Sequence, residues 1–283
     1  MAAVPPPAAP RTVGERCLIG WMSRADAVKH LTEEAIDPRF DEQSAAEAWE
    51  DYHNRVQQLP ERNTIAPDRL PLTADERAIR DTFMRHHRGD QSVRDVIKID
   101  PSRCVVLGHQ WWIITERVEM YAATVRSAKD KHRRSLGIGE PVSHNLTTLP
   151  ADNAIRLALP HAEFRVALTP NGLEIQQAAR HISVTAFENR LLLFAGYHRS
   201  FALSALHNPE PIARSLVVVL TTDADSLVSP TSPYQALRDM ARADRPPLFA
   251  DFFEDRLCMS LRVRKRRPEL WVQGQIKWSD DPS

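Results

Sequence analysis

Hydrophobic residues in the first third of the chain recur every three or four positions, which is the period of an amphipathic helix. The clearest set lies on one face of a helix expected over residues 42–59 and consists of Trp49, Tyr52, Val56 and Leu59. Thr73 and Glu76 have the spacing of a capping box, so they predict the start of a further helix. These patterns predict a helical N-terminal subdomain.

The pattern changes in the middle of the chain, where short apolar runs are separated by turn residues. Strands are expected at residues 182–187 and 191–195, with a tight turn between them. Gly196 ends the second strand, and helical spacing follows over residues 200–207. The run 216–220 then predicts another buried strand. A succession of strand, turn, strand, helix and strand is typical of an α+β core.

Two further segments show the period-two alternation of β-hairpins. Residues 164–168 and 173–175 flank a Pro-Asn-Gly turn. Residues 257–263 and 270–278 also alternate, and they predict a C-terminal hairpin whose turn is the run 265–268.

The chain therefore divides into four expected parts, and the expected fold class is α+β. The parts are a disordered proline-rich arm at 1–13, a helical N-terminal subdomain at 14–92, a mixed α/β core at 93–250, and a C-terminal β-hairpin and tail at 251–283.

Composition excludes several classes of protein. Lys plus Arg and Asp plus Glu both number 37, so the net charge is zero, whereas proteins that attach electrostatically to nucleic acid or lipid are usually basic. Glycine is scarce (9 residues), and neither a P-loop nor a dinucleotide-binding glycine motif occurs. No flavin or NAD site is therefore indicated. No apolar run approaches the roughly 20 residues that span a bilayer, so no membrane partner is expected.

Cysteine usage favours a cytoplasmic protein. Cys17, Cys104 and Cys258 are odd in number and far apart, and no C-x-x-C motif occurs. This spacing argues against a disulfide framework and against a cysteine-rich zinc site, so neither a disulfide nor zinc is expected.

The candidate chemistry lies where the strand 191–195 meets the following helix. A helix N-terminus offers free N–H groups and the positive end of the helix dipole, which together attract anions. Gly196 lets the backbone approach a ligand, and Arg199 has the forked guanidinium that suits phosphate oxygens. His198 can bind the same group or move a proton near neutral pH.

This block resembles the ParB/sulfiredoxin superfamily, whose members share the pattern I-x-V followed by G-x-[HR]-R-x-x-A. The matching residues are Ile182, Val184, Gly196, His198, Arg199 and Ala202. The resemblance covers about 40 of the 283 residues, and it suggests a protein of bacterial type. It implies a sulfiredoxin-like core that grips the phosphates of a nucleotide, with Mg²⁺ as the accompanying ion.

The resemblance also implies roles for individual residues. Phosphate or nucleotide binding falls to Gly196, Tyr197, His198, Arg199 and Ser200. His198 and Glu188 are the catalytic candidates for hydrolysis or transfer of a phosphoryl group; a solvated hairpin carboxylate is the alternative for Glu188. Sulfiredoxins carry a reactive cysteine where this chain has Tyr197, so their redox chemistry is not expected.

Two other interpretations stay open at this point. In the first, the block is only a strand-to-helix turn whose His and Arg residues cap and solvate the helix. In the second, the same core is a non-catalytic DNA-associated or regulatory module. DNA contact would then use the basic residues of the C-terminal hairpin, namely Arg262, Arg264, Lys265, Arg266 and Arg267.

Overall fold

The structure is a computed structural model of the 283-residue chain. It describes residues 12–62, 66–107, 112–123, 125–138, 145–149, 154–158, 164–169, 172–177, 181–205, 214–221, 239, 242–264 and 269–273. Helices and mixed sheets together confirm the α+β class. The chain forms two units, one of residues 1–139 with 180–264 and the other of residues 140–179 with 265–283.

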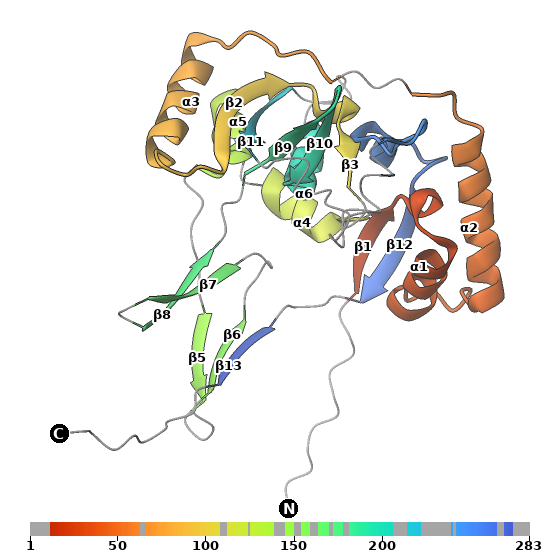
Figure 1. The fold of residues 1–283 in the computed structure, drawn as a ribbon. Helices are drawn as coiled ribbons and strands as arrows, with labels where there is room; N and C mark the ends of the chain where they lie inside the picture. The colour runs from red at the N-terminus through yellow and green to blue at the C-terminus, as the bar shows by residue number, and fades with distance from the viewer. Residues whose placement is uncertain are drawn as a thin grey trace, which may run out of the picture. The chain divides into compact units, whose positions relative to one another are not determined.

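A five-stranded mixed sheet forms the centre of the first unit (Figure 1). Its strands, in spatial order, are β2 (Val93–Ile99), β11 (Ser215–Leu220), β9 (Ser183–Phe187), β10 (Arg190–Ala195) and β3 (Val105–Val106). β11 runs parallel to β9, and β10 runs parallel to β3, while the other two pairs are antiparallel. The apolar runs of β9, β10 and β11 are buried, as their continuous hydrophobicity predicts.

A second sheet in the first unit pairs a strand from the start of the chain with a strand that lies about 250 residues later in the sequence. β1 (Thr12–Cys17) lies between β12 (Met259–Arg264) and β4 (Trp112–Ile114), antiparallel to both. Along β12, buried or half-buried apolar residues alternate with exposed polar residues, as the period-two pattern predicts.

Six α-helices surround these sheets within the described residues. They are α1 (Arg24–Lys29), α2 (Glu42–Gln57), α3 (Ala74–His86), α4 (Thr115–Ala122), α5 (Ala128–Ser135) and α6 (Tyr197–Ala205). α1 continues into a π-helical turn over His30–Glu34. The predicted capping box of α3 is confirmed, since the Thr73 side chain accepts from the Glu76 N–H and the Glu76 carboxylate accepts from the Thr73 N–H. None of the helices described is long and apolar enough to cross a membrane.

The second unit consists of strands. β5 (Asn145–Leu149), β6 (Ala154–Ala158) and β13 (Glu269–Gln273) form an antiparallel sheet in the order β13-β6-β5. β7 (Phe164–Thr169) and β8 (Gly172–Gln177) form the hairpin that their alternation predicts.

The predicted C-terminal hairpin over 251–283 is wrong. β12 pairs with β1 in the first unit, and β13 pairs with β6 in the second. Alternation shows that a segment is a strand with one buried face, but it does not say which strand lies beside it. Here both strands find partners far away in the sequence.

An ion pair attaches the segment before α3 to the short helix Phe249–Phe253. Arg62 donates from Nη1 and Nη2 to the two carboxylate oxygens of Asp251, at 2.5 and 2.8 Å. The Asp251 side chain is only 3% exposed, and burial raises the pKa of its carboxyl even though Arg62 opposes that rise. The Leu248 N–H also donates to Asp251, at 2.8 Å. This carboxylate is therefore buried with three hydrogen bonds that compensate its charge.

Arg62→Met is expected to lower the free energy of unfolding by about 3 kcal/mol, because it leaves a buried carboxylate without its cation. Urea unfolding measures the change. Arg39→Met is the matched control, since Arg39 forms an exposed ion pair with Asp37 and its loss should leave the midpoint unchanged. Equal midpoints for the two variants would contradict a stabilising role for the Arg62–Asp251 pair.

Candidate functional site

The turn between β10 and α6 depends on a glycine. Gly196 has φ +84°, and a Cβ added there would lie 2.7 Å from the Ile182 Cα and 2.9 Å from the His181 carbonyl oxygen. Both the left-handed conformation and the close approach of the backbone favour glycine. The prediction of a buried strand that ends at Gly196, followed directly by a helix, is confirmed.

The N-terminus of α6 is oriented by this turn. The Ser200 N–H donates to the Gly196 carbonyl at 2.8 Å, which is the first hydrogen bond of the helix. Tyr197, His198 and Arg199 form the first turn of α6. They lie at the positive end of the helix dipole, where an anion is stabilised.

Arg199 is buried rather than exposed at this end of α6, with 2% of its surface accessible. Its Nη1 donates to the Arg134 carbonyl at 2.7 Å, in the last turn of α5. Its guanidinium carbon lies 4.8 Å from the centre of the Tyr121 ring on α4. Arg199 thus connects three helices, and its positive charge is held in one position beside the turn.

Two buried polar atoms near the turn lack a hydrogen-bond partner within the described residues. They are the hydroxyl of Ser200, which is 1% exposed, and Nδ1 of His181, the residue whose carbonyl adjoins Gly196. A buried polar atom without a partner costs free energy, so such atoms usually bind water or a ligand.

His181 reports the electrostatics of the site. Its pKa is lowered to about 4, mainly by burial and also by the charges of His87 and Arg199, while the charge of Asp90 opposes the shift. His181 also packs edge-on against the rings of Phe83 and His87. Burial and the nearby charge of Arg199 therefore both disfavour an added positive charge at His181.

The structure places the predicted site residues in two separate regions. Gly196, Tyr197, His198, Arg199 and Ser200 lie together, with Tyr197 half-buried and His198 6% exposed. The rings of Tyr197 and His198 lie 4.4 Å apart.

Glu188 lies beyond the opposite end of β10 from Gly196, and the six residues of that strand span about 20 Å. It occupies the turn with φ +51°, and its half-exposed carboxylate accepts two hydrogen bonds from Arg242, at 2.9 and 2.7 Å. The structure does not bring Glu188 and His198 together, so a joint catalytic role has no support in the geometry.

The basic candidates for nucleic acid are described only in part. Arg262 and Arg264 are on the exposed face of β12, alternating with the buried residues Leu261 and Val263. Lys265, Arg266 and Arg267 lie outside the described residues. A DNA contact through this segment stays a prediction.

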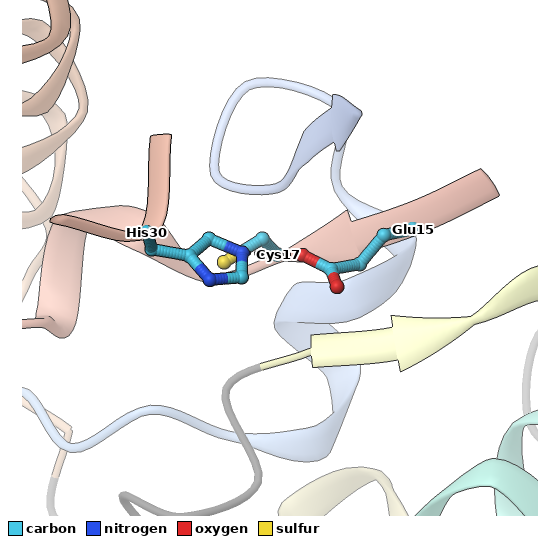
Figure 2. Close-up of side chains that lie close together, drawn as sticks. All are labelled: Glu15, Cys17 and His30. Atoms are coloured by element: carbon cyan, nitrogen blue, oxygen red, sulfur yellow. Dashed lines mark hydrogen bonds and ion pairs between the residues drawn. The ribbon is translucent and has the colours of Figure 1, made fainter. Parts of the chain in front are cut away.

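Sequence patterns missed several residues that the fold brings together. Tyr121, Arg134 and His181 surround the predicted block, although they come from three other segments. A second group, Glu15, Cys17 and His30, also clusters away from α6 (Figure 2). Alternation on one strand could have placed Glu15 beside Cys17, but no spacing indicates His30.

Comparison with known proteins identifies no relative, since no family model, curated protein or solved structure matches the chain. The resemblance to the ParB/sulfiredoxin superfamily thus stays at the level of the short motif around Gly196. A functional conclusion must come from the geometry of the site.

Gly196→Ala is expected to destabilise the fold by about 3 kcal/mol or more, because the added Cβ combines a strained φ with a clash against the Ile182 backbone. Gly89→Ala is the control: Gly89 has φ +100°, but a Cβ there would meet nothing within 4 Å. It should cost about 1 kcal/mol. Urea unfolding at one pH compares them, and equal losses would mean that the turn tolerates a side chain.

The lowered pKa of His181 predicts a pH-dependent stability. Above pH ~6.5 the residue is neutral in both states, but between pH ~6.5 and about 4 only the unfolded chain takes up its proton. Stability should therefore fall as pH falls through this window, by up to about 3 kcal/mol. His181→Gln should reduce this loss, whereas His86→Gln, at an exposed position, should not. Identical pH profiles for all three proteins would contradict the lowered pKa.

Proposed function

We propose that the chain binds a phosphorylated ligand, with a nucleotide as the first candidate, at the N-terminus of α6. The observation that carries the proposal is the unsatisfied Ser200 hydroxyl, buried one turn into a helix whose N-terminus adjoins a tight glycine turn. A phosphate oxygen supplies an acceptor for a hydroxyl and for backbone N–H groups at once. The motif that resembles the ParB/sulfiredoxin superfamily supports the same ligand class.

Each group near the turn has a defined part in this proposal. The first turn of α6 supplies the positive end of the helix dipole, which stabilises a phosphate as at other helix N-termini. The Ser200 hydroxyl adds a hydrogen-bond donor. His181 Nδ1, which also has no partner within the described residues, is positioned next to the turn.

Arg199 contributes charge rather than a mobile clamp. Because its guanidinium is held by the Arg134 carbonyl and the Tyr121 ring, it needs no reordering when a ligand arrives. A fixed positive charge in a buried environment attracts an anion more strongly than an exposed one does. Replacing Arg199 would also remove contacts between helices, so it is a poor residue for testing ligand binding.

The ligand test uses isothermal titration calorimetry with inorganic phosphate, ATP, CTP, GTP and ADP, each with and without Mg²⁺. Ser200→Ala is expected to lower the affinity of the best ligand about tenfold or more. A hydrogen bond to a charged group contributes roughly 1.5–3 kcal/mol, and 1.4 kcal/mol corresponds to a factor of ten. Release of inorganic phosphate, measured on the same samples, reports whether the bound nucleotide turns over.

Ser204→Ala is the matched control for this titration. Its hydroxyl is also buried and also lacks a partner within the described residues, but it lies one helical turn farther from Gly196. The control should bind as the wild type does. Failure of every phosphorylated probe to bind the wild type, or equal affinities for Ser200→Ala and wild type, would overturn the proposal.

A further inference from the structure

Three side chains with metal-binding atoms meet on the strand that joins the ends of the first unit. Glu15 and Cys17 are two residues apart on β1, so their side chains lie on the same face of the strand. His30 comes from the turn that follows α1. Figure 2 shows the His30 ring pointing toward the Glu15 carboxylate, with the Cys17 sulfur beside it. One ligand atom from each residue lies within 4.8 Å of the other two.

We propose that Glu15, Cys17 and His30 bind a single Zn²⁺ ion. A thiolate, an imidazole and a carboxylate are the three ligand types that zinc takes in proteins, and three protein ligands leave a fourth position for water. The softness of the sulfur argues against Mg²⁺ and Ca²⁺, which prefer oxygen ligands throughout. This site is separate from the N-terminus of α6 and does not depend on the proposed phosphorylated ligand.

A comparison of Glu15 with the other buried carboxylates supports the zinc assignment. The charges of Asp251 and Glu76 are each offset by several hydrogen-bond partners. Asp251 receives two hydrogen bonds from Arg62 and one from a backbone N–H. Glu76 contacts Lys98 Nζ at 2.8 Å and His132 Nε2 at 2.9 Å, and it also accepts the Thr73 N–H.

Glu15 is buried to the same degree, with 3% of its side chain exposed, but within the described residues its hydrogen-bond partner is His30 alone. The His30 Nε2 lies 2.6 Å from Oε1. Buried carboxylates are normally paired with cations or coordinate metals. A divalent ion between Glu15, His30 and Cys17 would supply the positive charge that this carboxylate otherwise receives from one imidazole.

A nucleophilic triad is the other chemistry available to a cysteine, a histidine and a glutamate. Cys17 has no exposed surface and belongs to the main core cluster, which suits an enclosed metal ligand better than a nucleophile that must attack a substrate. The Cys17 S–H donates to Met22 Sδ, at 3.9 Å. Burial therefore favours an enclosed metal site over covalent catalysis.

Zinc binding requires that the Cys17 thiol lose its proton and that the ligands neutralise the two positive charges of the ion. The Cys17 S–H bond breaks, its proton passes to solvent, and a bond from sulfur to Zn²⁺ forms. With His30 neutral, the thiolate and the carboxylate carry two negative charges that match the ion. Because binding releases the thiol proton, binding becomes weaker as the pH is lowered.

The consequence for the fold is a crosslink between α1 and β1. The ion would join His30, at the end of α1, to β1, and His30 also packs on Trp112 of β4 with ring centres 5.5 Å apart and planes 14° apart. Zinc should thus raise the melting temperature of the full-length chain.

Cobalt(II) replaces zinc as a visible probe in the test. The full-length chain is freed of metal with a chelator and titrated with Co²⁺ under reducing conditions. We expect one equivalent to bind and to give a thiolate-to-cobalt charge-transfer band, which Zn²⁺ then abolishes by displacement. Cys17→Ala should lose the band, and His30→Gln should weaken Co²⁺ binding at least tenfold. Addition of Mg²⁺ should leave the band unchanged.

Cys104→Ala is the matched control, because Cys104 is equally buried but lies outside the cluster, and it should keep the band. If Cys17→Ala does not fold, His30→Gln decides, since its side chain is at the edge of the core with 10% exposed. The proposal is overturned by a wild type that gives no band. It is equally overturned by a band that survives in Cys17→Ala, or by unchanged affinity in His30→Gln.

Discussion

The approach of the Gly196 backbone to the start of β9 is the constraint on which the candidate site depends. Because no side chain fits between Gly196 and Ile182, β10 can turn into α6 directly against its neighbouring strand. That turn determines where α6 begins and places Ala202 and Leu203 in the same buried cluster as Val184 and Leu193. The helix N-terminus, the buried Arg199 and the unsatisfied Ser200 hydroxyl all follow from it.

Compensation of buried charge is the second constraint on this fold. Arg199, Asp251 and Glu76 are all removed from water, and each is held by partners from distant segments: the Arg134 carbonyl, Arg62 and Lys98, respectively. Such contacts orient helices as well as offsetting the cost of burial. Glu15 departs from this rule, since it has a single imidazole as partner within the described residues. The smaller number of partners distinguishes Glu15, as a candidate metal ligand, from the carboxylates of the other buried ion pairs.

The two candidate sites differ in which of their side chains already contact other protein groups. At α6, the large charged residue is engaged with protein groups, and the groups that remain for a ligand are small donors. At β1, all three side chains carry metal-binding atoms. A short motif therefore pointed to the first candidate region, but it did not indicate that Arg199 is buried and held by the Arg134 carbonyl.

The sequence by itself determined the local structure. Capping residues such as Thr73 with Glu76, the apolar run of β10 and the glycine after it act within a few positions of one another, so periodicity and turn chemistry identify them. Only the tertiary structure decided which segments meet. β12 pairs with β1 instead of forming a hairpin, and β1 lies beside the turn that carries His30. Alternation records which face of a strand is buried, but pairing depends on contacts across more than 200 residues, which no local pattern contains.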